Sequence, residues 1–287
     1  MKILIKDYTS SRSTQAMYLV HGLQNVPNVQ AGLWSGDGSL YDAMDQFQPD
    51  LLIMHMLAFG NDVVSYLRDD DTPPVKLAMC VTGVTNESIE GVDANLRRDG
   101  LSDSIALYFS SRNKNMLPKT KTTMLPLLEA ADPVAVGKHS MDYKIDTCVV
   151  IDKESEVRND DYGRSFHFAS SNPDLQGKAD LCLNQGQLAT LLKNYSNVVI
   201  KHATSTIPQV FFDAALSGAR PVFALDNKDD QTRIGELCKK LFGFSCLRGD
   251  DIDHEAVAQI VAEKHTATNR VKTLISQLPI NQRFFEL

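Results

Sequence analysis

A predicted helix at residues 207–217 begins in a setting suited to phosphate chemistry. It follows three hydroxyl residues, Thr204, Ser205 and Thr206, the last of which can cap the helix. The free backbone N–H groups and the positive dipole end at residues 204–208 can receive phosphate oxygens. This arrangement favours the binding of a nucleoside diphosphate.

One acid, Asp213, lies beside the apolar stripe of this helix. At about 100° per residue, Asp213 lies roughly 20° in azimuth from Thr206 and about 10 Å further along the axis. Its carboxylate can therefore accept hydrogen bonds from the ribose hydroxyls of a nucleotide bound at the helix start. A capping threonine and a boundary acid in water give the same pattern, so the residues alone leave both interpretations open.

The elements that must position these residues alternate between strand and helix. The first half contains five short apolar runs, KILIKDY, VQAGLW, PDLLIMHM, VKLAMCVTG and SIALYFSS, with helical patterns between them. The alternation lapses around residues 118–145 and resumes with DTCVVID. Short apolar strands separated by helices favour parallel sheets covered on both faces.

We therefore expect an α/β protein of two Rossmann-like domains whose parallel sheets face each other across a cleft. The first domain spans residues 1–130 and the second spans 131–270. A tail at 271–287 crosses back to the first domain. Ligands of such sheets bind at the carboxyl ends of the strands, so each domain offers one site.

The composition excludes several classes of protein. Of 287 residues, 43% are hydrophobic and 23% are charged, and the net charge is −7. No run approaches the roughly 20 apolar residues that span a bilayer, so we expect no membrane partner. The five cysteines show no CxxC spacing. This argues against zinc and disulfide frameworks and favours a reducing, cytoplasmic location.

The stretch PQVFFDAALSGARPVFALD resembles the nucleotide-binding helix of GT-B glycosyltransferases. The order of elements along the chain is most similar to phage DNA β-glucosyltransferases and the related spore-maturation glycosyltransferases. TTMLPLLEAADP resembles the segment by which such enzymes pass into their second domain. The resemblance implies a GT-B fold and transfer of a sugar from a nucleoside diphosphate donor to an acceptor hydroxyl.

The resemblance assigns the donor site to the second domain. Asp213 takes the place of the ribose-binding acid, and Arg158 takes that of a diphosphate-binding arginine. The family's helix arginine falls on Val210, so we expect Lys201 and His202 to neutralise the remaining phosphate charge. The implied cofactor is a nucleoside diphosphate sugar, with a UDP-sugar as the first choice. A divalent metal stays an open alternative that no residue pattern indicates.

Transfer also needs a base that deprotonates the acceptor hydroxyl. In the phage enzymes an aspartate follows the fourth strand of the first domain, and the aligned position here is Gly83. Glu87 is the nearest acid in that loop, and Asp37, after the second strand, is the alternative. Asp7 and His21 are further candidates, and the sequence does not decide among them.

The acceptor that the resemblance implies is a hydroxymethylated pyrimidine in phage DNA, extruded from the duplex for the reaction. DNA binding depends on clustered cations, which the net charge of −7 does not supply generally. We expect the acceptor contacts in the first domain, from Ser10, Ser11, Arg97, Arg98, Arg112 and Lys114. A solvated surface is the alternative interpretation of these cations. Two further alternatives are a GT-B enzyme acting on a saccharide, protein or small molecule, and a non-catalytic relative that only binds nucleotide sugars.

Overall fold

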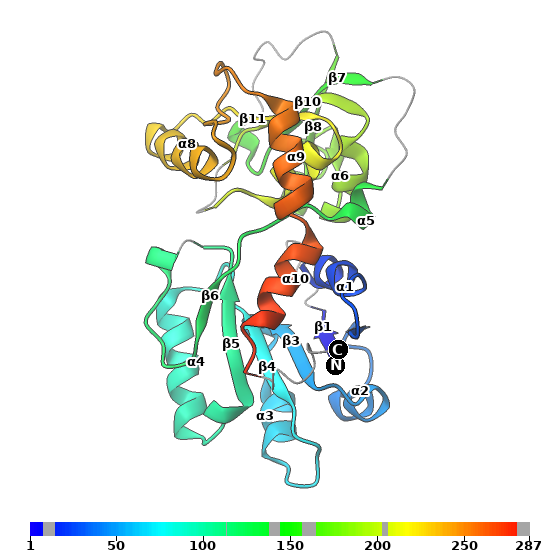
Figure 1. Ribbon diagram of the computed structural model, residues 1–287, viewed down its shortest axis with the longest axis vertical. Coiled ribbons are helices and arrows are strands. Elements are labelled where there is room, and N and C mark those ends of the chain that lie inside the picture. Colours follow the sequence, from blue (N-terminus) through cyan, green and yellow to red (C-terminus); the bar gives the residue numbers. More distant parts are fainter. Residues whose placement is uncertain (8–14, 113, 138–143, 157–164, 203–205, 280–287) are drawn as a thin grey trace. The chain divides into compact units, whose positions relative to one another are not determined.

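The computed structural model describes residues 1–279 except 8–14, 113, 138–143, 157–164 and 203–205. The chain divides into two compact units (Figure 1). The described residues of unit 1 lie within 1–128 and 270–279, and those of unit 2 lie within 129–269. Each unit is built around one sheet.

Unit 1 contains a six-stranded sheet in which every pair of neighbouring strands is parallel. The strand order is β2-β1-β3-β4-β5-β6. The strands are β1 (Lys2–Lys6), β2 (Gln30–Trp34), β3 (Leu51–His55), β4 (Lys76–Cys80), β5 (Ile105–Ser110) and β6 (Met124–Pro126). The helices are α1 (Gln15–Leu23), α2 (Leu40–Phe47), η1 (Met56–Ala58), α3 (Asn61–Arg68), α4 (Asn86–Arg98), η2 (Ser102–Ser104) and η3 (Lys114–Met116).

Unit 2 contains a five-stranded parallel sheet in the order β11-β10-β7-β8-β9. Its strands are β7 (Ile145–Val150), β8 (Phe166–Ser170), β9 (Leu181–Cys182), β10 (Tyr195–Ile200) and β11 (Arg220–Phe223). Its helices are α5 (Pro133–Val136), η4 (Glu154–Glu156), η5 (Pro173–Leu175), α6 (Gln185–Leu192), α7 (Gln209–Leu216), α8 (Lys228–Phe242) and α9 (His254–Lys264). A last helix, α10 (Ala267–Ser276), begins in unit 2 and continues with residues of unit 1.

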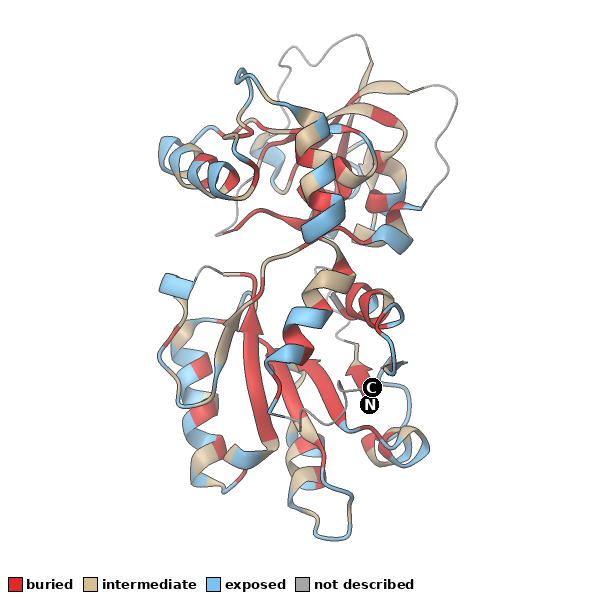
Figure 2. Ribbon diagram, viewed as in Figure 1, coloured by how far each residue is buried: buried red, intermediate tan, exposed pale blue. Residues whose placement is uncertain are grey.

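The central strands of both sheets are buried on both faces, as Figure 2 shows in red. Continuous apolar runs such as Leu51–Met54 and Val198–Ile200 produce this burial, because helices cover a doubly wound sheet on each side. In unit 2, Phe211 of α7 stacks on Phe223 of β11, with ring centroids 5.2 Å apart. The predicted α/β class with two parallel sheets is confirmed.

The strand orders identify one switch point in each sheet, where successive strands depart in opposite directions. In unit 1 the chain adds β2 on one side of β1 and β3 on the other. In unit 2 it adds β8 on one side of β7 and, later, β10 on the other. The loops that leave neighbouring strands diverge at such a point, and the crevice there is where open α/β sheets bind ligands. Ligand binding is therefore expected at the carboxyl ends of β1 and β3 in unit 1, and of β7 and β10 in unit 2.

Candidate functional site

Lys201 and His202 leave the carboxyl end of β10, at the switch point of unit 2. The Lys201 backbone N–H donates to the carbonyl of Val150, the last residue of β7, over 3.0 Å. Asp152 and Glu156 follow β7, and the Glu156 carboxylate accepts the Asp152 backbone N–H at 2.7 Å. Sequence position alone predicted that Lys201 and His202 end their strand, and the structure places them beside the loop that follows β7.

The Lys201 side chain is buried, with 3% of its surface exposed, and its ammonium lies 4.0 Å from the Asp226 carboxylate. It borders a cavity of about 440 Å³ at the carboxyl ends of β10 and β11. The cavity is lined by Lys201, Phe223, Ala224, Leu225, Asp226, Gln231, Leu247, Arg248 and Asp250. A buried ammonium is stable only beside groups that compensate its charge, and the Asp226 carboxylate is one such group. The cavity lining carries two cations, Lys201 and Arg248, together with the Asp226 and Asp250 carboxylates.

His202 has an imidazole whose pKa is lowered by burial, against the opposing influence of the Asp152 and Glu156 carboxylates. Its Nδ1 is buried and makes no hydrogen bond with the residues that the structure describes. Buried polar nitrogens are normally hydrogen-bonded, so this atom is a candidate ligand contact.

The start of α7 differs from the prediction. The helix begins at Gln209, with Pro208 at its N-cap and no side-chain cap, whereas the sequence predicted a start at residue 207 capped by Thr206. Thr206 is buried. The Gln209 backbone N–H, the first of the helix and the one that follows the predicted phosphate-binding residues 204–208, donates to the carboxylate of Glu129. A proline cannot serve as a side-chain acceptor, and Glu129, which is distant in sequence, supplies the acceptor in its place.

Asp213 also departs from its predicted role. It is 1% exposed, and its carboxylate accepts the backbone N–H of Asp132 at 2.8 Å. A ribose-binding acid must face a ligand, whereas Asp213 faces the N-cap of α5. The Asp213 carboxylate is thus directed into the unit together with the apolar stripe, and not toward the solvent side where a ribose could bind.

Two amides near α7 were not predicted. The Gln185 side chain, at the first residue of α6, donates to the Gln209 side-chain oxygen over 2.9 Å. The sequence did carry a signal for the start of α6, since Asn184 and Gln187 form a capping box. Nothing in the sequence indicated that the first residues of α6 and α7 would meet.

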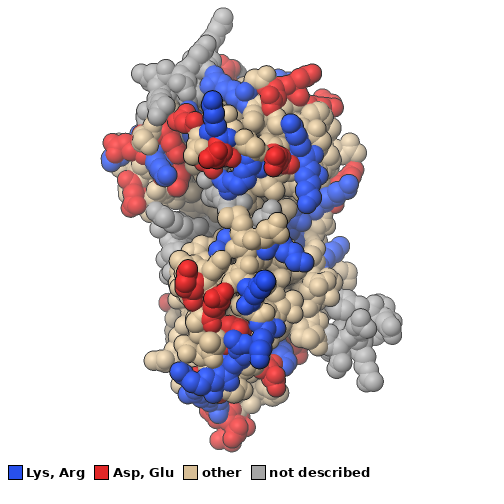
Figure 3. All heavy atoms as spheres, turned by 90° about the vertical axis from the view of Figure 1, so that its left-hand side faces the viewer, with Lys and Arg blue, Asp and Glu red and all other residues tan. Residues whose placement is uncertain are grey.

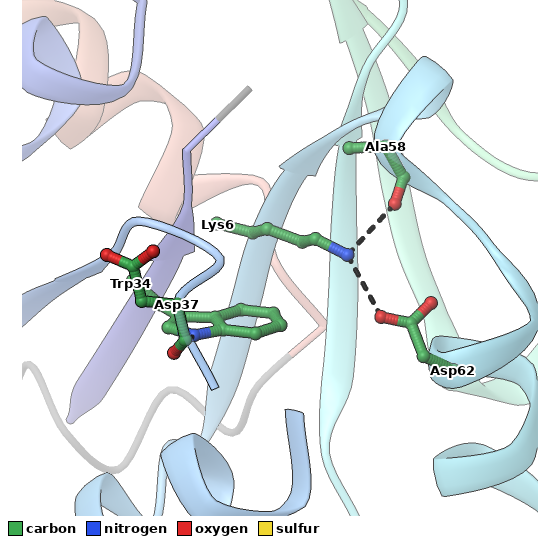
Figure 4. Close-up of polar contacts among 5 residues, drawn as sticks. All are labelled: Lys6, Trp34, Asp37, Ala58 and Asp62. Carbon is green, nitrogen blue, oxygen red and sulfur yellow. Dashed lines mark hydrogen bonds and ion pairs between the residues drawn. The ribbon is translucent and has the colours of Figure 1, made fainter. Parts of the chain in front are cut away.

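At the switch point of unit 1, Lys6 ends β1 and is held by three groups (Figure 4). Its ammonium lies 3.1 Å from the Asp62 carboxylate and 3.2 Å from the Ala58 carbonyl oxygen. It also lies over the Trp34 ring, 5.0 Å from the centroid. None of these contacts was predicted, because the partners come from β2, η1 and α3.

The predicted bases of unit 1 are surface residues. Glu87 is exposed in the first turn of α4, which follows β4. Asp37 is exposed in the loop after β2, where its carboxylate accepts the Ser35 hydroxyl at 2.8 Å. His55, at the end of β3, has a pKa lowered mainly by burial. Its Nδ1 accepts the Leu57 N–H, so its Nε2 carries the proton and donates to the Thr82 carbonyl at 2.8 Å.

The predicted acceptor cations do not form one patch. Arg97 and Arg98 end α4, which runs back from the carboxyl edge of the sheet, so they lie at its amino-terminal edge. They form ion pairs with Asp93 and Asp99 respectively. Basic and acidic side chains are interspersed on the face drawn in Figure 3.

The other two cations follow β5, at the opposite edge. Arg112 donates to the Val84 carbonyl at 2.8 Å and to the Asn86 side chain at 3.1 Å, so it joins two loops of the unit. Lys114 is exposed in η3. The expectation that all four cations lie on the acceptor side is therefore wrong for Arg97 and Arg98.

Five predicted site residues lie outside the part of the chain that the structure describes: Ser10, Ser11, Arg158, Thr204 and Ser205. Among the described residues, no three His, Cys, Asp or Glu side chains are placed to hold a metal ion. The described helices include none with the length and apolarity to cross a membrane.

Comparison with known proteins finds no matching family model and no matching curated protein. Among solved structures, the chain is similar to the spinosyn forosaminyltransferase SpnP, with 12% identity, a TM-score of 0.43, and coverage of 97% of this chain and 95% of that one. It is also similar to the glycotransferase of kitacinnamycin, with 12% identity, a TM-score of 0.43, and coverage of 97% of this chain and 99% of that one. The similarity to OtsA has 8% identity, a TM-score of 0.45, and coverage of 96% of this chain and 94% of that one. A likeness of this degree adds nothing to the two-sheet architecture.

Proposed function

We propose that this protein is a glycosyltransferase that uses a nucleoside diphosphate sugar, with UDP as the favoured nucleotide. The observation that carries the proposal is the buried Lys201 ammonium at the cavity beside the switch point of unit 2. Glycosyl transfer requires a cation near the leaving diphosphate, because negative charge grows on it as the glycosidic bond breaks. Lys201 is proposed to supply that cation.

The remaining donor contacts come from groups around the same edge of the sheet. His202 Nδ1 offers a second polar contact for the diphosphate. Asp226 and Gln231, which line the cavity, carry a carboxylate and an amide that can hydrogen-bond sugar hydroxyls. Arg158, from the loop after β7, is proposed as a further diphosphate ligand, as are the Thr204 and Ser205 hydroxyls before α7.

The proposed donor site changes the role of α7. Its first N–H is bonded to Glu129 and Asp213 is internal, so neither is free to hold the nucleotide as the sequence suggested. Lys201 and His202 therefore take the main part in phosphate binding, and a direct contact between α7 and the diphosphate would require Glu129 to move away.

The acceptor belongs to unit 1 in this proposal. A hydroxymethylated pyrimidine in DNA is the acceptor implied by the family resemblance, and Lys114 is the exposed predicted cation on the carboxyl side of the sheet. A saccharide, protein or small molecule is the alternative acceptor. Glu87 and Asp37 are the bases that the sequence proposed for this acceptor.

Isothermal titration of UDP into the wild type and the Lys201→Met variant tests the donor site. Loss of one charge-assisted contact weakens binding by about 10- to 100-fold. Lys240→Met, which removes an exposed lysine of α8, is the matched control and binds UDP as the wild type does. Equal affinity of Lys201→Met and the wild type would overturn the site.

Incubation with UDP-glucose and either hydroxymethylated or plain DNA, followed by mass spectrometry of the DNA, tests the acceptor. A hexose added only to hydroxymethylated DNA supports the DNA acceptor. Release of UDP that rises when a saccharide, protein or small molecule is added, with no modified DNA, favours another acceptor. Binding of UDP without any release favours the non-catalytic alternative.

A further inference from the structure

The ion pair between Lys6 and Asp62 joins the end of β1 to α3, the helix that follows β3 and η1, at the switch point of unit 1. Lys6 ends β1, while Asp62 lies in the first turn of α3, which follows β3 and η1. Lys6 is 13% exposed in its side chain, and its ammonium is fixed by the Asp62 carboxylate, the Ala58 carbonyl oxygen and the Trp34 ring. Figure 4 shows the ammonium extended toward the Asp62 carboxylate and the Ala58 carbonyl oxygen.

Lys6 holds one oxygen of the Asp62 carboxylate, and the Asp62 side chain is partly open to solvent. Its Oδ2 lies on the Lys6 ammonium at 3.1 Å, and 46% of its side chain is exposed. Its other oxygen, Oδ1, lies against Gly60, where an added Cβ would approach it to 3.0 Å. Glycine at position 60 therefore leaves room for this oxygen, and the lysine fixes its orientation.

Glu87, Asp37 and His55 are less well placed than Asp62. Glu87 follows β4, and Asp37 follows β2, so each lies one strand away from the crevice between β1 and β3. His55 does end β3, but both of its ring nitrogens are engaged in hydrogen bonds within the unit. Asp62 combines a position near the crevice, an orientation fixed by Lys6 and a side chain that is 46% exposed.

We propose that Asp62 is the general base of the sugar transfer and that Lys6 is its positioning residue. This assignment rests on the proposed function. As the acceptor oxygen bonds to the anomeric carbon of the sugar, its proton moves to Asp62 Oδ1. The bond between that carbon and the diphosphate oxygen breaks, and its electron pair leaves with the diphosphate. The Lys6 ammonium keeps Oδ2 occupied, so Oδ1 is the oxygen that meets the acceptor hydroxyl.

The test measures UDP release from UDP-glucose with water as the acceptor, together with the Kd for UDP by calorimetry. Asp62→Asn removes the base with little change of shape, and kcat falls on the order of 10²- to 10⁴-fold while the Kd for UDP is unchanged. Asp42→Asn, in the first turn of the neighbouring α2, is the matched control and keeps full activity. Asp62→Glu keeps the charge but moves the carboxylate, so it folds as the wild type does and retains partial activity.

The positioning role of Lys6 has a separate readout. Lys6→Met lowers kcat without changing the Kd for UDP, and Lys6→Arg, which keeps a cation, restores part of kcat. Wild-type activity in Asp62→Asn, or its loss in Glu87→Gln or Asp37→Asn instead, overturns the assignment and leaves the proposed function intact. A wild type that neither binds UDP nor releases it from UDP-glucose contradicts the proposed function and this assignment with it.

Discussion

Asp213 and Asp132, 81 residues apart in the chain, are joined by a hydrogen bond from the Asp132 backbone N–H to the Asp213 carboxylate, 2.8 Å long. The Asp132 side chain in turn accepts the N–H groups of Val134 and Ala135, which caps α5. Glu129, three residues before Asp132, accepts the first N–H of α7. Asp213 of α7 thus accepts a backbone N–H from the 129–136 segment, and Glu129 of that segment accepts a backbone N–H from α7. These two hydrogen bonds attach residues 129–136 to α7.

Replacement of Asp213 should lower stability through the Asp132 N–H. Asp213→Leu leaves that buried donor without its acceptor, and the free energy of unfolding falls by about 1–3 kcal/mol. Asp213→Asn keeps an oxygen in place and has the smaller effect. Urea denaturation checks both, with Asp229→Asn, an exposed acid in the first turn of α8, as the control. If Asp213→Leu is as stable as the wild type, the hydrogen bond between Asp132 and Asp213 does not contribute to stability.

Stability should fall as the pH rises through neutrality. Burial raises the pKa of Glu129 to about 7, from an ordinary 4.5, against the opposing influence of the Gln209 N–H. Burial is also the main cause that raises the pKa of Asp213, to which the Asp132 and Glu129 charges add. The folded state therefore binds more protons than the unfolded state between about pH 4.5 and 7, and stability present below that window is lost as the pH passes through it.

The variant Glu129→Gln should flatten this pH dependence. One pKa unit corresponds to about 1.4 kcal/mol, so the shift of Glu129 accounts for roughly 3 kcal/mol across the window. Urea denaturation from about pH 5 to about pH 8 measures the slope in both proteins. Glu87→Gln, which changes an exposed acid, should keep the wild-type slope. A Glu129→Gln protein with the wild-type slope would show that another group titrates.

We expect Arg112 to contribute to the stability of unit 1, whether or not it also binds a ligand. Its guanidinium joins the loop after β5 to Val84 and Asn86, so Arg112→Met leaves two acceptors without their donor. We expect unit 1 to lose about 1–3 kcal/mol. Lys114→Met, two residues away and exposed, should leave the denaturation midpoint unchanged. A larger loss of stability in Lys114→Met than in Arg112→Met would contradict the structural role of Arg112.

UDP should stabilise the folded protein through Lys201. A ligand at 100 times its Kd adds about 2.7 kcal/mol to the free energy of unfolding, which raises the thermal midpoint. Thermal denaturation with and without UDP should show this shift in the wild type and in Lys240→Met. The same UDP concentration should give a smaller shift in Lys201→Met. A full shift in that variant would place the nucleotide elsewhere.

Several features could be predicted from local sequence, because their causes are local. The alternation of apolar strands and helical patterns indicated two parallel sheets, and both are present. Gly218 was predicted to end the helix before it, and it follows α7 with a φ of +78°, which glycine adopts without strain. The position of Lys201 and His202 at the end of a strand also followed from the run NVVIKH.

The direction of each side chain could not be predicted, because it depends on partners far away in the chain. The predicted spacing of Asp213 from Thr206 assumed one continuous helix, whereas α7 begins only at Gln209, and the Asp132 N–H decides which way the Asp213 carboxylate faces. The start of α7 moved because Glu129, 80 residues before Gln209, bonds to its first N–H.

The sequence by itself determined the class of fold, the extent of its apolar strands and the turn at Gly218. Only the tertiary structure decided the strand orders, and with them the two switch points at which Lys201 and the Lys6–Asp62 pair lie. The physical reason is that strand pairing and long-range hydrogen bonds depend on the packing of whole sheets and helices, whereas periodicity and backbone preference act over a few residues.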